Sequence, residues 1–294
     1  MSFRINQSLL SRRQFAVFAA ASAAGLNALA KTEFPVGLQQ TAVGRNIQQD
    51  LHGTLRAVAK MGYDVIEFSA GSFMNWSPDQ AREVRALLDE INLKCRSTHN
   101  EIVSFTGDGL SKSIELNQIL GSRTLVSVRG PGPTPGGGAA RGGTPATPPT
   151  LDAWKRFSEQ LSQAAGRIRS AKMTLGFHNH GIEFQPVEGT RPIDILAANQ
   201  DITSFHLNIG LCLQAGGDPI AFIQQCPGRI QSLLIQDYKG QARWKEIFSA
   251  AEGKGGLQFY LIQRTDGLFL VQREGNDLLD FAQQDLQYFR RLHG

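Results

Sequence analysis

Side chains that can move protons or bind metal ions gather in four short segments, each at the end of a β-like run. One of them is GFHNHGIEF, in which His178 and His180 flank Asn179 and precede Glu183. Residues two apart on a strand point to the same side, so both imidazoles are expected to face one pocket. Their ring nitrogens could there bind a metal ion or move protons, although a lone histidine in a strand is usually a core residue.

The other three segments each bring a carboxylate to the end of an apolar run. Glu67 stands in VIEF, where a buried carboxylate is costly without a partner or solvent, so we expect it to face a pocket. His99 and Glu101 lie in STHNE and are further pocket candidates. Asp237 in LLIQDY either joins this pocket or, in the interpretation we prefer, caps the turn after its strand.

Eight β-like runs from Phe34 onward are the elements that must position these side chains. Segments with apolar residues at helical spacing separate the runs, which is typical of alternating strands and helices. The predicted strands are 35–39, 64–68, 93–99, 123–128, 173–178, 204–208, 232–236 and 258–263. The predicted helices include 113–120, 154–171, 192–198, 219–225, 244–251 and 277–292.

Eight strand–helix units within residues 31–294 predict a (β/α)8 barrel that forms a single domain. A doubly wound parallel sheet is the alternative, but no glycine-rich phosphate fingerprint follows the first strand. Side chains at the carboxyl ends of barrel strands converge on one pocket, so this fold would bring the four segments together. Residues 130–149 have almost no apolar side chains and are predicted to be a flexible loop on the same face, either a lid or an insertion without a role.

Residues 1–30 have the pattern of an export signal of the twin-arginine type. Arg12 and Arg13 precede a short apolar stretch over 16–26, and small residues over 28–30 fit a cleavage site. A core helix is the alternative interpretation of this stretch. We therefore expect an exported, periplasmic protein without a stable membrane anchor after cleavage.

The composition excludes a mostly disordered chain and does not favour a nucleic-acid-binding protein. With 41% hydrophobic and 19% charged residues the chain can form one large core. Three of the four net positive charges lie in the first 30 residues, and no basic stripe favours a nucleic-acid partner. The three cysteines, Cys95, Cys212 and Cys226, form no CxxC motif and are interpreted as buried small apolar residues, with a single disulfide as the alternative.

Several motifs in the right order resemble the sugar phosphate isomerase/epimerase group of xylose-isomerase-like barrels. They are GLQQTAVGR, GTLRAVAKMGYDVIEF, STHNE, LGFHNHGIEF, LCLQAGGDPIAFIQQCPGRIQSL and WKEIFSAAE. The resemblance covers nearly all of residues 31–294. It implies a divalent metal ion (Mn, Mg or Zn), held by carboxylates and histidine from strands five to eight, that polarises a sugar while acid and base groups move a proton.

The chain departs from this implied pattern at the metal positions. HLNIG places Asn208 where the group has an aspartate, and LLIQD places Leu234 and Gln236 where it has a histidine and a lysine. LIQR places Gln263 where it has a glutamate. Two neutral amides and an alkyl group are poor replacements for carboxylates and an imidazole, so we expect no metal cofactor or, at most, one held by His178 and Glu183.

Two functions follow as hypotheses. The first is an enzyme that acts on a sugar, keto-sugar or glycoside by proton transfer. Its predicted catalytic residues are His178, His180 and Glu67, and its predicted substrate contacts are His99, Glu101, Asn179, Asn208, Gln236 and Gln263. The second is a catalytically silent carbohydrate-binding or partner subunit, and the sequence leaves a homo-oligomer or a paralogous partner open.

Overall fold

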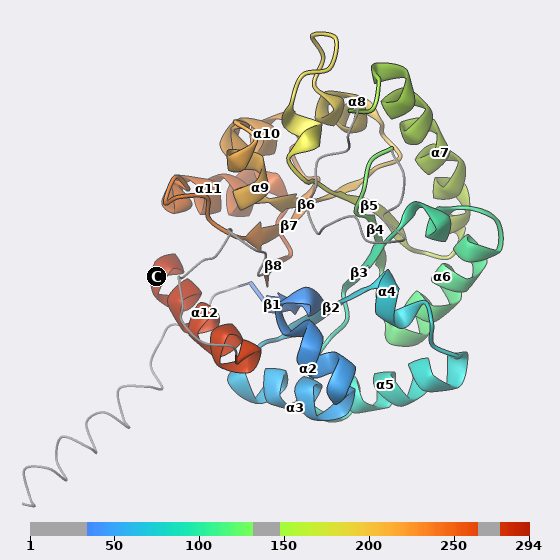
Figure 1. Cartoon of the computed structure of the whole chain (residues 1–294), viewed down its shortest axis with the longest axis vertical. Coiled ribbons are helices and arrows are strands. Elements are labelled where there is room, and N and C mark those ends of the chain that lie inside the picture. The colour runs from blue at the N-terminus through green and yellow to red at the C-terminus, as the bar shows by residue number, and fades with distance from the viewer. Residues whose placement is uncertain (1–33, 132–147, 264–276) are drawn as a thin grey trace, which may run out of the picture.

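Eight parallel strands close into a barrel in the order of the sequence, with β8 paired to β1 (Figure 1). The computed structural model describes residues 34–131, 148–263 and 277–294. Helices surround the barrel, and α12, near the carboxyl terminus, packs against α3 and α11. The predicted (β/α)8 barrel is therefore confirmed, and the doubly wound sheet was wrong.

All eight strands fall on predicted runs, with differences only at their ends. The third strand was predicted from Leu93 but begins at Ser97, because Lys94 forms only an isolated bridge with Val65. The seventh begins at Ile230, two residues earlier than predicted. The strands are β1 Val36–Gln39, β2 Val65–Ser69, β3 Ser97–Asn100, β4 Thr124–Ser127, β5 Thr174–His178, β6 Ser204–Asn208, β7 Ile230–Ile235 and β8 Phe259–Ile262.

Helices follow each strand, and some contain an additional short turn. The α-helices are α2 Gly44–Gln49, α3 Leu51–Met61, α4 Ala70–Phe73, α5 Pro78–Glu90, α6 Gly107–Leu120, α7 Leu151–Ser170, α8 Pro192–Ala198, α9 Ile209–Gln214, α10 Pro219–Gln225, α11 Trp244–Ala250 and α12 Leu278–His293. The 3-10 turns are η2 Gln40–Val43, η3 Ile102–Phe105 and η4 Ile182–Phe184, and η5 Ala251–Gly255 is a π-turn. The sixth helix begins at Gly107, earlier than the predicted Ser113.

Local signals in the sequence set several helix ends. Ser77 and Gln80 form a capping box before α5, and the Thr150 hydroxyl accepts a hydrogen bond from the Ala153 backbone N–H at the start of α7. Gly62 ends α3 with φ of 96°, a left-handed conformation that glycine adopts without strain. These caps fix where the chain turns back to the next strand.

The barrel interior contains an apolar layer and a polar layer. Val65, Leu234, Phe259 and Leu261 pack together as a separate buried cluster. Gly37 leaves room for this cluster, because a Cβ atom there would lie 2.7 Å from Leu261 Cδ2 and 2.9 Å from Val65 Cβ. Glu67 on β2, His99 on β3, His178 on β5 and His206 on β6 are also buried, so the barrel encloses polar groups toward its carboxyl end.

The larger core lies between the barrel and the helices. Trp154 and Trp244 are buried in it and pack against the rings of Phe157 and Phe248. All three cysteines are buried and free, so the interpretation as small apolar residues is confirmed and no disulfide joins them. No helix in the part of the chain that the structure describes is long and apolar enough to cross a membrane.

Two predicted features lie wholly or mostly outside the described residues. The export signal, residues 1–30, is one of them. Most of the predicted loop over 130–149 is the other, since residues 132–147 are not described. Both remain predictions.

Candidate functional site

Glu67 stands at the centre of the polar layer with no exposed surface. Its Oε2 atom lies 2.8 Å from His99 Nε2, and its Oε1 atom lies 3.4 Å from His206 Nδ1 and accepts a short hydrogen bond from the Ser97 hydroxyl. Burial alone would raise the pKa of Glu67, but the contacts with the two imidazoles outweigh it and lower the pKa. The carboxylate is therefore ionised in the barrel interior.

Gln39 on β1 fixes the orientation of the His99 ring. The backbone N–H of Thr41 donates to Gln39 Oε1 at 2.7 Å, which directs the amide nitrogen of Gln39 to Ser69 Oγ and to His99 Nδ1, 3.3 Å away. In this hydrogen-bond network His99 Nδ1 accepts, which places the ring proton on Nε2, the nitrogen 2.8 Å from Glu67 Oε2. Both ring nitrogens of His99 contact protein groups, so the geometry favours a role in orienting neighbouring side chains. The predicted contact between His99 and a substrate stays a prediction.

A row of three imidazoles extends from this cluster toward the carboxyl end of β5. The ring centroids of His99 and His178 are 4.7 Å apart, and those of His178 and His180 are 5.1 Å apart. Burial, together with His99 and His180, lowers the pKa of His178 well below its ordinary value. Burial, together with Arg129 and His99, lowers the pKa of His180 to about 4. Both rings are thus neutral near pH 7 and able to accept a proton.

Glu183 lies beside His180 in the turn that follows β5. Its Oε2 atom accepts a hydrogen bond of 2.9 Å from the His180 backbone N–H, whereas Oε1 is buried without a hydrogen-bond partner. Burial raises the pKa of Glu183 to about 7. A carboxyl group with this pKa is partly protonated near neutral pH and can exchange protons there.

The amides at the predicted substrate positions bond mainly to one another. Asn179 Oδ1 accepts from the Asn208 backbone N–H at 2.7 Å, and Asn179 Nδ2 donates to the Asn208 carbonyl at 3.2 Å. Asn208 Nδ2 donates to Gln263 Oε1 at 3.1 Å, while Asn208 Oδ1 caps α9 at the Leu211 N–H. These contacts join the ends of β5, β6 and β8. The structure thus brings Asn179, Asn208 and Gln263 together.

The remaining predicted residues occupy the rim and the interior. Glu101 forms an ion pair with Arg129, with 3.3 Å between Oε1 and Nε. Gln236 follows β7 and is fully buried. The Asp237 carboxylate accepts from the Ala242 backbone N–H at 3.2 Å, which confirms the preferred interpretation that it caps the turn. The predicted substrate contacts of Glu101 and Gln236 stay predictions.

Sequence reasoning missed three residues of this cluster, namely Gln39, Ser97 and His206. His206 is fully buried between Glu67 and the Phe259 ring, whose centroid is 5.7 Å away. A signal was available, since His206 and Asn208 alternate on one predicted strand as His178 and His180 do. Nothing in the sequence pairs Ser97 with the Glu67 carboxylate or Gln39 with the His99 ring.

The amino-acid sequence matches one known protein family. Residues 55–216, more than half of the chain, match the family described as xylose isomerase-like TIM barrel. The chain belongs to this family. A comparison with curated proteins finds no match.

Solved structures with the same fold carry different activities in their names. A sugar phosphate isomerase/epimerase from Parabacteroides distasonis ATCC 8503 has a TM-score of 0.68 and 20% identity, over 89% of this chain and 95% of that one. D-psicose 3-epimerase from Clostridium cellulolyticum H10, solved with D-tagatose, has a TM-score of 0.62 and 15% identity, over 88% and 99%. The probable 3-DHS dehydratase AsbF from Bacillus anthracis has a TM-score of 0.59 and 10% identity, over 87% and 98%. At these identities the likeness shows the fold alone.

The raised pKa of Glu183 predicts a pH-dependent stability difference for Glu183→Gln. The pKa of Glu183 is 4.5 in its ordinary state and about 7 in the folded chain. The stability contributed by the protonated carboxyl group is therefore fully present below pH 4.5 and is lost as the pH rises through 7. Glutamine has no charge to bury, so the variant should match the native chain at pH 4.5 and exceed it by about 3 kcal/mol at pH 8.5. Urea unfolding at both pH values measures this.

Glu115→Gln is the matched control, because Glu115 lies exposed on α6. It should leave the stability difference near zero at both pH values. A Glu183→Gln difference that is the same at pH 4.5 and 8.5 would contradict the assignment.

Proposed function

We propose that this barrel is an enzyme of the isomerase and epimerase type, which moves a proton on a sugar, keto-sugar or glycoside. The observation that carries the proposal is the contact between His178 and His180 at the carboxyl end of β5. Both imidazoles are neutral near pH 7, and the half-buried His180 lies at the edge of the polar layer. Each neutral imidazole has an unprotonated ring nitrogen that can take a proton from a substrate carbon, and its lowered pKa makes it a weaker base than a free imidazole.

In the proposed reaction His180 or His178 accepts a proton from the carbon next to the substrate carbonyl. The Glu183 carboxyl group then returns a proton to the same carbon from the other side, or the protonated ring returns its proton to the former carbonyl carbon while the adjacent hydroxyl proton moves to the former carbonyl oxygen. Proton exchange with solvent restores the starting protonation of the imidazole and of Glu183. Glu67 has no exposed surface, so it acts through the imidazole row rather than on the substrate. Its fixed negative charge stabilises a cationic imidazole formed during the reaction.

The proposal assigns no step to a metal ion. The residues at the positions where the family resemblance implies ligands do not fit one: the Asn208 and Gln263 amides bond to each other, and Leu234 packs with Val65 and Leu261. A divalent ion of this type prefers charged oxygen or imidazole donors. Within the described ranges, no group of three or more His, Cys, Asp and Glu side chains is arranged as a metal site.

The proposed substrate class is an unphosphorylated sugar. The epimerase from Clostridium cellulolyticum H10 was solved with D-tagatose, a free ketose, and an exported protein would meet free sugars rather than phosphorylated intermediates. Export is itself part of the proposal and rests on Arg12, Arg13 and the apolar stretch after them.

A silent carbohydrate-binding or partner subunit is the second candidate. The observation that favours it is the mutual bonding of Asn208 and Gln263, which engages two of the side chains otherwise free to hold a substrate. Such a subunit would bind a sugar without exchanging its protons. The exchange experiment below separates the two candidates.

Proton exchange tests the enzymatic proposal directly. The chain is incubated in D2O with D-fructose, D-tagatose or D-psicose, and NMR reads deuterium at the carbons next to the carbonyl. We expect exchange by the native chain, and a loss of about a hundredfold or more in His180→Gln or His178→Asn, because general-base catalysis contributes this much.

His52→Gln is the control, since His52 lies exposed on α3, away from the imidazole row. Its exchange rate should equal that of the native chain. Exchange that survives in a folded double variant of His178 and His180 would contradict their assignment, and sugar binding without exchange would favour the silent subunit.

Metal binding should appear only when the ligand positions are rebuilt. The triple variant Asn208→Asp, Leu234→His, Gln263→Glu is expected to bind Mn2+ with about micromolar affinity, since it regains charged oxygen and imidazole donors. Calorimetry and metal analysis measure this, with Leu234→His alone as the control. Near-stoichiometric metal in the native chain, purified without chelators, would contradict the proposal.

Export should depend on the two arginines. In a bacterial host with a twin-arginine export route, we expect periplasmic protein that begins after Ala30, and cytoplasmic protein for the double variant Arg12→Lys, Arg13→Lys. Cell fractionation and amino-terminal sequencing measure both. Equal export of the two chains would contradict the signal.

A further inference from the structure

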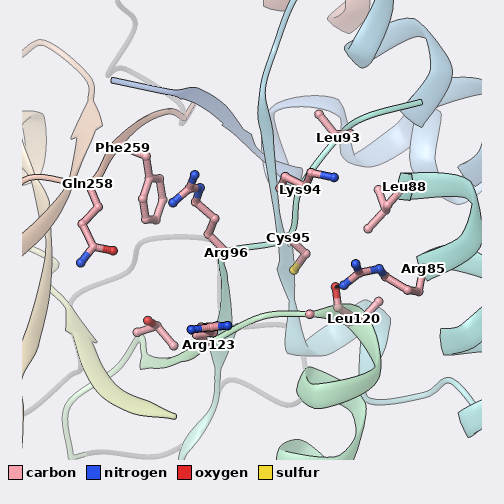
Figure 2. A pocket seen from close by; sticks show the side chains of 12 residues that line it. Arg85, Leu88, Leu93, Lys94, Cys95, Arg96, Leu120, Arg123, Gln258 and Phe259 are labelled. Carbon is pink, nitrogen blue, oxygen red and sulfur yellow. Dashed lines mark hydrogen bonds between the residues drawn. The ribbon is translucent and has the colours of Figure 1, made fainter. Parts of the chain in front are cut away.

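A basic cavity lies at the opposite end of the barrel from the imidazole row. It has a volume of about 310 Å3 and is lined by residues just before β3, β4 and β8, together with the end of α6 and one side of α5 (Figure 2). Four cationic side chains contribute to its lining, and no carboxylate does. They are Arg85, Lys94, Arg96 and Arg123.

Two of these cations are already balanced by one carboxylate. Asp89 on α5 lies 2.7 Å from Arg85 Nε and 3.9 Å from Lys94 Nζ. Arg85 also donates to the Leu120 carbonyl at 3.2 Å, which holds it at the α6 end of the cavity. The Cys95 thiol adds no negative charge, because burial raises its pKa.

The other two cations have no such balance. Among the residues that the structure describes, no carboxylate lies within ion-pair distance of Arg96 or Arg123. Ser97 and Thr124 are register partners on β3 and β4, so the arginines that precede them start neighbouring strands. Like charges at adjacent positions repel, and an anion between them would remove this repulsion.

The Arg96 side chain is held in a way that leaves its hydrogen-bond donors available. Its guanidinium carbon lies 6.0 Å from the centre of the Phe259 ring. A cation–π contact uses the face of the guanidinium and leaves its in-plane N–H groups free, and this planar fork matches the oxygens of phosphate. Arg96 and Gln258 both lie beside Phe259 in the cavity (Figure 2).

We propose that this cavity binds a phosphate group, held by Arg96 and Arg123 and supplied either as free phosphate or as a small phosphate ester. Paired guanidinium groups form charge-assisted hydrogen bonds with such an anion. The volume exceeds what one phosphate fills, which leaves room for the organic part of an ester. The site is separate from the proposed sugar site and does not depend on that function.

Calorimetric titration of the native chain with inorganic phosphate and with glycerol 3-phosphate tests the proposal, at an ionic strength held constant with NaCl. We expect saturable binding at one site. Arg96→Gln and Arg123→Gln should each weaken it at least about tenfold, because each removes charged hydrogen bonds. Arg96→Lys keeps the charge without the fork and should give an intermediate affinity.

Arg82→Gln is the control for net charge. Arg82 lies on the same helix as Arg85 but pairs with Asp79 outside the cavity, so its removal should leave the phosphate affinity unchanged. Tighter binding of glycerol 3-phosphate would identify an ester as the ligand, and equal binding would identify free phosphate. Absence of saturable phosphate binding, or equal weakening of it by Arg82→Gln, would overturn the proposal. Proton exchange on sugars, measured with the same variants, shows separately whether the proposed enzyme fails.

Discussion

One buried carboxylate organises the inside of this barrel. Glu67 has no exposed surface, and an ionised group in that position is stable only when donors from the protein replace water. Ser97 on β3 donates a hydrogen bond to the carboxylate, and the imidazoles of His99 on β3 and His206 on β6 lie 2.8 and 3.4 Å from its oxygens. Because β3 is the neighbour of β2 whereas β6 lies far from it in the sheet order, only a closed barrel brings His206 to the same carboxylate.

The same constraint shapes the imidazole row above it. Gln39 orients His99, the His99 ring contacts His178, and His178 contacts His180 at the end of β5. Burial removes water from these rings and keeps His178 and His180 neutral near pH 7. Burial in the barrel therefore keeps two imidazoles unprotonated near its carboxyl end.

The fold itself leaves the chemistry open. Solved neighbours with this architecture include an isomerase/epimerase and a probable dehydratase, so the activity depends on which side chains the strand ends carry. Here those ends combine an imidazole row with amides that bond across β5, β6 and β8. At the amino-terminal end of the barrel, residues usually serve stability rather than catalysis. There Arg96 and Arg123 have no carboxylate partner among the described residues.

The sequence by itself determined the barrel and its order of elements. Apolar runs of strand length alternate with helical spacing, and local signals such as Ser77 and Thr150 set helix starts, because these depend only on residues near in sequence. It also located His178, His180 and Glu67 at strand ends. Strand ends were predicted less accurately where part of a β-like run forms no ladder with its neighbour, as at Leu93, four residues before β3 begins.

Only the tertiary structure decided which of these residues meet. The partners of Glu67 lie 30 residues away at Ser97 and on β6 at His206, and no local pattern encodes contacts across a closed barrel. The neutral state of His178 and the raised pKa of Glu183 likewise follow from burial, which exists only once the helices and strands have packed. The basic cavity has the same origin, since Arg96 and Arg123 become neighbours through the pairing of β3 with β4.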